Sequence, residues 1–251
     1  MAAAPEVQIL WSDTHLVVVS KPAGLPSLPD GYEPQAPHLK SLLEPDFGRL
    51  WIVHRLDRDT SGVVVLARSA NDHRALNTQF ARRETAKIYH ALVAGIPDWQ
   101  EKDVRLALRP DGDRQHRTII DPRQGKPAHT HLRLLERYAS SLPRGGVSAP
   151  RGWALLEATP TTGRTHQLRA HLSALGLPIL GDRLYGGSDL ALSQLKAGVR
   201  QERPLLTRLA LHAWSLTIRH PSQGELLTFT ASYPKDLQVA LRLLRKYGLL
   251  T

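Results

Sequence analysis

The stretch WIVHRLDRDTSGVVVL, residues 51–66, carries a cluster of charged residues between two apolar segments. It places an acidic residue, Asp57, between Arg55 and Arg58, with apolar segments on both sides. Neighbouring positive charges keep a buried carboxylate ionised, and an ionised carboxylate in a cleft is a nucleophile or a base. The same residues also suit a surface turn with an ordinary ion pair, so residue chemistry alone leaves both interpretations open.

The composition limits the class of protein. The chain has 251 residues, 41% of them hydrophobic, which is typical of a globular protein. Lys and Arg together number 33 against 23 Asp and Glu, a formal net charge of +10. Most of the basic residues are arginine, whose flat, charged fork suits phosphate and planar groups. The excess therefore suggests a polyanionic partner, although an arginine-rich background would give the same composition.

Several classes of protein are poor fits. The absence of cysteine excludes disulfides, thiolate metal sites and a cysteine nucleophile. The N-terminus lacks a signal-peptide pattern, and apolar stretches such as 16–19 and 63–67 are far shorter than the roughly 20 residues of a membrane span. The 12 histidines form no convincing metal-ligand set. We therefore expect a soluble, cytoplasmic protein without a metal site or a membrane partner.

Short β-rich runs separated by glycine and proline dominate the chain. The expected strands are Val7–Trp11, Leu16–Ser20, Gly62–Arg68, Lys87–Gly95, Val104–Arg109, Ala128–Arg137, Trp153–Thr159, Leu211–Arg219 and Glu225–Ala231. Apolar residues at helical spacing predict three helices, over Ser69–Arg83, Thr165–Leu175 and Asp236–Tyr247. This order predicts an α+β fold with a mixed, mostly antiparallel central sheet and flanking helices and loops.

Three loops stand out. Pro22–Pro37 is too rich in proline and glycine for a regular element, and Pro110–Lys126 is polar and basic. Ser140–Gly152 has the composition of an insertion between two strands. No linker divides the chain clearly, so we expect one domain over residues 1–251, which could contain two sub-halves.

Two further segments carry chemically active side chains. GRTHQLRAH, residues 163–171, opens an expected helix on which Arg164, Leu168 and His171 would share one face. A helix start offers unpaired N–H groups to an anion, but the spacing alone slightly favours an amphipathic helix with a solvated Arg and His side. On the expected strand 87–95, Tyr89 faces away from its neighbours, where a tyrosine most often serves packing.

Together these segments resemble the RluA-type pseudouridine synthases. The most specific match is HRLDRDTSG at residues 54–62, and the GRTHQLR segment at 163–169 is nearly as specific. KPAGL at residues 21–25, Tyr89, and LHA at 211–213 leading to His220 and Pro221 follow the family's order. The resemblance runs from about Val7 to Pro234. It implies a pseudouridine synthase fold and an enzyme that converts selected uridines in folded RNA to pseudouridine.

The resemblance also implies catalytic roles. Asp57 corresponds to the family's nucleophile, and Arg164 to the arginine that pairs with it and keeps it ionised. Tyr89 corresponds to the tyrosine that stacks on the target base and is a candidate for proton transfer at C5. The carboxylate could attack C1′ or C6, or assist elimination at C2′, and the sequence does not choose among these routes.

Other residues are expected to contact RNA. The resemblance implies that Arg55 helps to displace the target base and that Leu168 lines the pocket, and we expect His54 and Thr60 of the same motif to contact substrate. Family members need no metal or organic cofactor. Unstacking a base costs a few kcal/mol, which a basic surface can offset. We expect the loops 22–37 and 110–126 to form the RNA-contacting rim, with its charge supplied by Arg114, Arg117 and Arg123.

The KPAGL segment begins at residue 21, so we expect no separate RNA-binding domain before it. A tRNA and a compact rRNA hairpin are then equally plausible substrates for an enzyme that we expect to be a monomer. Residues 57–60 also fit the Asp-x-Asp-x-Thr loop of Mg²⁺-dependent phosphohydrolases, although His54 and Arg55 interrupt the strand that such a loop requires. A catalytically silent RNA-binding protein would explain the charge, but not the match at Asp57, Tyr89 and Arg164.

Overall fold

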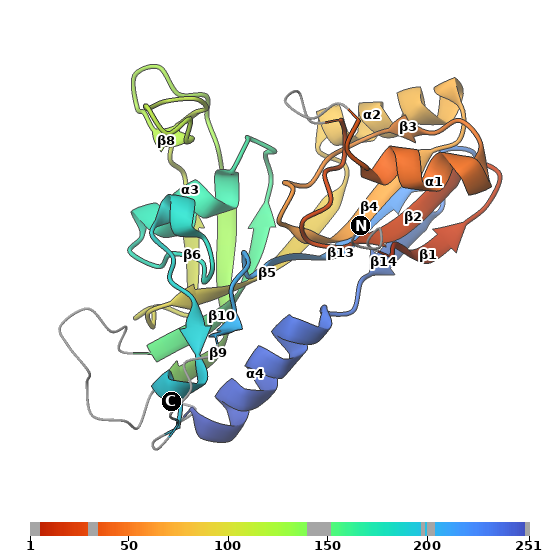
Figure 1. The fold of residues 1–251 in the computed structure, drawn as a ribbon. Helices are drawn as coiled ribbons and strands as arrows, with labels where there is room; N and C mark the ends of the chain where they lie inside the picture. The colour runs from red at the N-terminus through yellow and green to blue at the C-terminus, as the bar shows by residue number, and fades with distance from the viewer. Residues whose placement is uncertain (1–5, 30–34, 140–151, 197–198, 200–203, 249–251) are drawn as a thin grey trace. The chain divides into compact units, whose positions relative to one another are not determined.

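The computed structural model describes residues 6–29, 35–139, 152–196, 199 and 204–248 (Figure 1). The chain forms two compact units. The first comprises Met1–Ile88 and His212–Tyr233, and the second comprises Tyr89–Leu211 and Pro234–Thr251. Nearly all of the predicted insertion Ser140–Gly152 lies outside the described residues.

The first unit is a sheet with two helices. The strands follow the order β1 (Gln8–Ser12), β2 (Leu16–Lys21), β4 (Ser61–Ala67), β13 (Leu211–Arg219) and β14 (Leu226–Thr230), and the short β3 (Trp51–Ile52) also pairs with β4. β13 runs parallel to β4, whereas β1–β2, β2–β4, β3–β4 and β13–β14 are antiparallel. The helices are α1 (Leu39–Phe47) and α2 (Ala70–Arg82).

β2 and β4 form the centre of this unit. The apolar runs Leu16–Val19 and Val63–Ala67 are buried on both faces of the sheet, and Leu76 of α2 packs against them. Each fully buried Val or Leu contributes about 1.5–3 kcal/mol to the free energy of unfolding. The continuous apolar sequence of both strands follows from this two-sided burial.

The second unit contains an antiparallel sheet in the order β5 (Ala86–Ala94), β10 (Gly152–Pro160), β9 (Thr130–Ala139) and β6 (Glu101–Val104). The chain passes from the first unit into the second within β5. Two short pairs accompany the sheet, β7 (Leu108–Arg109) with β8 (Ile119–Ile120) and β11 (Leu190–Ala191) with β12 (Pro204–Leu206). The helical elements are α3 (Gln167–Ala174), α4 (Lys235–Tyr247), η1 (Arg183–Tyr185) and η2 (Leu192–Gln194).

The last helix is held by apolar and ionic contacts. Its buried side chains Leu237, Ala240, Leu241 and Leu244 are those that the helical spacing predicted. At its C-terminal end, Arg245 donates to both carboxylate oxygens of Glu136 on β9, at 2.8 and 2.6 Å. At its N-terminal end, Asp236 accepts two hydrogen bonds from Arg208, at 2.6 and 2.7 Å. Bidentate pairs of this kind fix orientation as well as distance.

The structure confirms the α+β class and the mostly antiparallel sheet, and each of the three predicted helices is present. The predicted strand Val104–Arg109 is wrong, because β6 ends at Val104 and a separate strand, β7, begins at Leu108. The basic segment Pro110–Lys126 is not simply a loop, since β8 within it pairs with β7. The described residues of the predicted loop Pro22–Pro37 contain neither helix nor strand. The short α1, β3, β8, β11 and β12 were not predicted.

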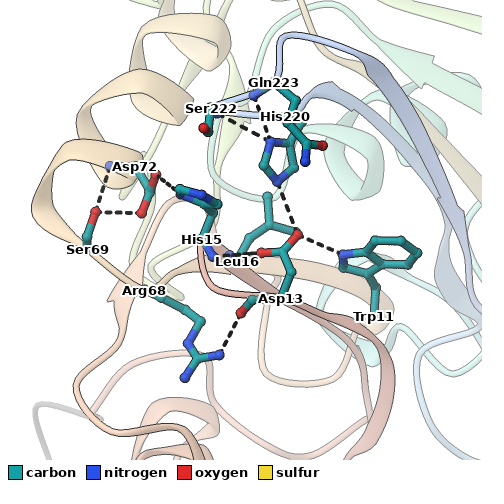
Figure 2. A network of polar contacts seen from close by, with 10 residues as sticks. All are labelled: Trp11, Asp13, His15, Leu16, Arg68, Ser69, Asp72, His220, Ser222 and Gln223. Atoms are coloured by element: carbon teal, nitrogen blue, oxygen red, sulfur yellow. Dashed lines mark hydrogen bonds and ion pairs between the residues drawn. The ribbon is translucent and has the colours of Figure 1, made fainter.

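A polar network fastens the turn between β1 and β2 (Figure 2). One oxygen of the Asp13 carboxylate accepts from the backbone N–H groups of His15 and Leu16, at 2.7 and 2.9 Å. The other oxygen accepts from the Trp11 indole at 3.1 Å and lies 3.1 Å from Nε2 of His220. Burial alone would raise the pKa of Asp13, but these hydrogen bonds lower it to about 2.

The contacts of His220 determine its tautomer. Its Nδ1 accepts from the backbone N–H groups of Ser222 and Gln223, at 3.3 and 3.0 Å, so the proton of the neutral ring is on Nε2. Nε2 therefore donates to Asp13. The network joins the β1–β2 turn to the residues that follow β13, at the end of β2 and β4 far from Lys21 and Gly62.

We expect Asp13→Asn to lower the free energy of unfolding by about 1–2 kcal/mol at pH 7, because an amide nitrogen cannot accept from Trp11 or His220. The native pKa lies below the unfolded value of about 4, so this contribution is present above pH 4 and is lost as the pH falls towards 2. Urea denaturation between pH 7 and pH 2.5 measures it. Asp46→Asn, at an exposed position on α1, is the control, and equal stability of the two variants at every pH would contradict the prediction.

Candidate active site

A buried lysine shapes the loop that carries Asp57. Lys21, at the end of β2, is fully buried, and its ammonium group donates to the carbonyls of Pro22, Leu25 and Arg58 at 2.9, 2.7 and 2.9 Å. A buried charge is costly unless hydrogen bonds satisfy it, and these three carbonyls do so. Two of them lie in the KPAGL segment and the third directly follows Asp57. The lysine therefore ties the N-terminal loop to the loop between β3 and β4.

Further backbone contacts fix this loop on both sides of Asp57. The Ser27 hydroxyl donates to the Leu56 carbonyl at 3.0 Å and accepts from the Leu56 N–H at 3.2 Å. After the acidic residue, the N–H of Thr60 donates to the Asp57 carbonyl at 3.1 Å and closes a turn. Leu56 is buried, Asp57 is partly buried and Arg55 is exposed. The loop therefore presents the Asp57 side chain from a backbone that is fixed immediately before and after it.

The end of the motif is fixed by the parallel pairing of β4 with β13. Gly62 faces Ala213, and a Cβ atom on Gly62 would lie 2.2 Å from the Ala213 carbonyl oxygen, so no side chain fits. The neighbouring Ser61 hydroxyl lies 2.9 Å from Nδ1 of His212, whose Nε2 lies 3.0 Å from the Ala231 carbonyl. These contacts bring together the SG and LHA segments, which lie far apart in the sequence.

His54 and Thr60 have structural contacts within this unit. The His54 ring stacks on Phe80 at 4.8 Å and 19°, and its Nε2 accepts from the Val65 N–H at 3.2 Å. Burial, followed by the charge of Lys87, lowers the pKa of His54 to about 3, so the ring is neutral at physiological pH. Thr60 is buried. The fold therefore accounts for both residues without an RNA contact, and the predicted contact remains untested.

In the second unit, Tyr89 and Arg164 lie near the same end of the sheet. Tyr89 pairs with Ala158 near the end of β10, and the turn that carries Arg164 begins directly after Pro160. Tyr89 is partly buried, as is Arg164. Tyr89 and the turn that carries Arg164 therefore lie at the same end of the paired strands β5 and β10.

A buried amide organises the Arg164 turn. The side-chain oxygen of Gln167 accepts from the Thr162 hydroxyl at 2.7 Å and from the Arg164 N–H at 3.1 Å. Its side-chain nitrogen donates to the His129 carbonyl at 2.9 Å and to the Thr130 hydroxyl at 3.0 Å. The first two contacts lie within the turn, and the other two hold it against the start of β9. This role of Gln167 was not predicted, because the residues that it joins are far apart in the sequence.

The predicted helical face is only partly correct. Leu168 and His171 are buried on α3, but the helix begins at Gln167, so Arg164 precedes it and shares no face with them. His166, immediately before the helix, adopts φ +50°, and this left-handed residue interrupts the helical path. The Arg164 side chain instead donates from Nε to the Pro127 carbonyl at 3.3 Å.

The three arginines of the predicted rim have different surroundings. Arg117 donates to Asp113 at 2.7 Å and to the Leu184 carbonyl at 3.3 Å, so its guanidinium is used within the protein. Arg114 and Arg123 are exposed. The segment is folded because Leu108 and Ile120 pack in a cluster with α3. The segment Pro110–Lys126 is therefore a basic hairpin that packs near α3, and its exposed arginines, Arg114 and Arg123, are accessible to a ligand.

The predicted site residues are divided between the units. His54, Arg55, Asp57 and Thr60 lie in the first unit, whereas Tyr89, Arg164, Leu168, Arg114, Arg117 and Arg123 lie in the second. The first unit supplies a carboxylate on a fixed loop. The second carries the Tyr89 phenol and the Arg164 guanidinium at one end of the paired strands β5 and β10. Within the described ranges, no group of three or more histidine or acidic side chains is arranged to hold a metal ion.

Comparison with known proteins identifies the family. The model of the RNA pseudouridylate synthase family matches residues 15–174. The chain is 37% identical over 227 residues to the dual-specificity RNA pseudouridine synthase RluA of Escherichia coli K12, covering 90% of this chain and 93% of that protein. It is 36% identical over 250 residues to the ribosomal large subunit pseudouridine synthase D of Nitrosomonas europaea, covering 97% of this chain and 67% of that protein. The chain therefore belongs to the RNA pseudouridine synthases of the RluA type.

Solved structures agree. Human RNA pseudouridylate synthase domain containing 4 aligns with a TM-score of 0.72 and 28% identity, covering 95% of this chain and 93% of that chain. Human RNA pseudouridylate synthase domain containing 1 aligns with a TM-score of 0.68 and 25% identity over 98% of both chains. The protein is an isomerase that acts on RNA. The phosphohydrolase alternative is not supported, since β3 ends at Ile52 and does not run into Asp57. None of the described helices is long and apolar enough to cross a membrane.

We expect Gly62→Ala to destabilise the protein by more than about 4 kcal/mol, because the added methyl group would collide with the Ala213 backbone. Gly48→Ala is the matched control, since Gly48 also has a positive φ but faces open space, and it should cost only about 1 kcal/mol. Urea denaturation of both variants measures the difference. Similar losses would show that backbone conformation, and not the contact with β13, selects glycine at position 62.

Proposed function

We propose that Asp57 is the nucleophile of the isomerisation, with Arg164 and Tyr89 acting on the same uridine. The main support is the loop around Asp57, in which hydrogen bonds from Lys21, Ser27 and Thr60 fix the backbone about a partly buried carboxylate. Such fixed geometry is what nucleophilic catalysis requires, because a positioned group reacts far faster than a mobile one. The family resemblance supports the same assignment.

The reaction needs few groups. The N1–C1′ bond breaks, the base turns, a C5–C1′ bond forms, and the proton on C5 leaves while N1 gains one. A single carboxylate serves attack at C1′, attack at C6 or assistance at C2′. A planar side chain such as Tyr89 replaces stacking that the flipped base has lost. Arg164 supplies the positive charge that favours the ionised carboxylate.

The substrate that we propose is a uridine in an rRNA or tRNA stem-loop. The similarity over nearly the full length of a protein named as a dual-specificity synthase supports action on more than one RNA. The formal charge of +10 supports binding to the phosphate backbone. Arg55, exposed beside the nucleophile, is suited to enter the space left by the base, and Leu168 to line the pocket. We propose that the protein acts as a cytoplasmic monomer.

We expect Asp57→Asn to reduce tritium release from RNA labelled at C5 of uridine by about 10³-fold or more, because the amide cannot act as a nucleophile. Single-turnover assays with excess enzyme measure the rate. Asp59→Asn, two residues away and exposed, should change it by no more than about twofold. Undiminished release by the Asp57 variant would refute the nucleophile assignment. Chelation of metal by EDTA should leave the rate unchanged, whereas strict Mg²⁺ dependence would favour phosphohydrolase-like chemistry.

We expect neutralisation of Arg114 or Arg123 to glutamine to weaken RNA binding and to lower the slope of log affinity against log salt by about one, since each would release about one counterion fewer. Arg117→Gln should leave the slope unchanged, because Asp113 and Leu184 already engage that guanidinium. Titrations at several salt concentrations measure the slopes. Equal slopes for all three variants and the parent would remove the hairpin from the RNA-binding surface.

A further inference from the structure

Tyr185 lies where three segments of the second unit meet. The residue is buried in η1, in a glycine-rich stretch to which the sequence assigned no role. Its hydroxyl accepts from the Thr118 N–H of the hairpin at 2.8 Å and lies 3.1 Å from Nδ1 of His166, in the turn that carries Arg164. Its carbonyl accepts from the Ser173 hydroxyl of α3 at 2.9 Å. One residue therefore joins the hairpin, the turn and the helix.

The ring of Tyr185 is held independently of its hydroxyl. The guanidinium of Arg169 lies over the ring, 4.8 Å from its centre. The same guanidinium donates to both carboxylate oxygens of the buried Asp182, at 2.7 and 2.8 Å. The Tyr185 N–H donates to the Asp182 carbonyl at 3.0 Å. Removal of the hydroxyl alone should therefore leave the ring in place.

The contact with His166 supports an uncommon backbone conformation. His166 has φ +50° and ψ 25°, the left-handed region that residues other than glycine adopt only when their surroundings hold them there. Its ring meets the Tyr185 ring edge-on, with 5.7 Å between centres. The Tyr185 hydroxyl donates its one proton to the Thr118 carbonyl at 3.3 Å, so in the contact with His166 it accepts from a protonated Nδ1. Arg164 lies only two residues before this left-handed residue.

We propose that Tyr185 is a positioning residue for the isomerisation. Its hydroxyl holds the His166 turn, and with it Arg164, in the arrangement that the reaction uses, and it ties that turn to the hairpin. The inference rests on the proposed role of Arg164. The hydroxyl contacts the turn and the hairpin backbone but neither of the exposed arginines, so its loss should slow the reaction of bound RNA far more than it weakens binding.

Single-turnover kinetics of Tyr185→Phe test this inference. The rate at saturating RNA should fall about tenfold, while the dissociation constant for RNA changes by less than about twofold. Tyr138→Phe is the matched control, since Tyr138 is a buried tyrosine of the same unit whose hydroxyl donates to Glu136 at 2.6 Å. That variant should lose stability in thermal denaturation and keep the parental rate. An unchanged rate for Tyr185→Phe, or an effect on binding alone, would overturn the proposal.

A double-mutant cycle tests the path through the turn. His166→Asn keeps a residue that tolerates the left-handed conformation but removes the ring. Tyr185→Phe should then slow the reaction much less in the His166→Asn variant than in the parent, whereas fully additive effects would overturn the proposal. Arg164→Ala in the same assay separates the two proposals. If Arg164→Ala reacts at the parental rate, the proposed roles of Arg164 and Tyr185 are both overturned. If Arg164→Ala reacts slowly but Tyr185→Phe reacts at the parental rate, only the proposed role of Tyr185 is overturned.

Discussion

The buried ammonium group of Lys21 makes the hydrogen bonds on which the loop that carries Asp57 depends. It satisfies three carbonyls from two segments that are more than 30 residues apart, and all three acceptors are backbone atoms. Because a lysine cannot stay charged in the interior without such partners, the two loops must remain together for either to keep its conformation. The KPAGL segment is therefore part of the support of Asp57, although none of its residues needs to react.

In the second unit, a neutral side chain joins two separate segments in a similar way. Gln167 uses its oxygen and its nitrogen to join the Arg164 turn to the start of β9. Beyond it, Tyr185 joins that turn to the basic hairpin, and the Arg169–Asp182 pair holds Tyr185. Asp57 and Arg164 thus both lie on irregular backbone whose polar groups are satisfied by a residue from another segment, whereas Tyr89 lies within β5. Loops held in this way have satisfied backbone polar groups and still leave their side chains accessible.

Much of the fold could be predicted because its central elements have simple apolar patterns, either continuous runs or helical spacing. The apolar runs of β2 and β4 and the helical spacing of α4 gave correct positions. The failures occurred where local signals conflict with tertiary contacts. Residues 104–109 have strand composition, yet the chain leaves the sheet after Val104 and starts a new pair at Leu108. The spacing of Arg164, Leu168 and His171 suggested one helical face, but His166 ends the regular path before Arg164 is reached.

The sequence by itself determined the reaction class, because the HRLDRDTSG and GRTHQLR segments are specific enough to identify the family and to point to Asp57 and Arg164. It also determined the excess of positive charge that RNA binding requires. Only the tertiary structure decided which residues of these motifs and of the basic hairpin serve the fold. His54 is a neutral, stacked side chain, Gly62 makes room for β13, and Arg117 is engaged by Asp113. The physical reason is that these roles depend on partners that folding brings close together. The local sequence does not specify which distant residues become neighbours.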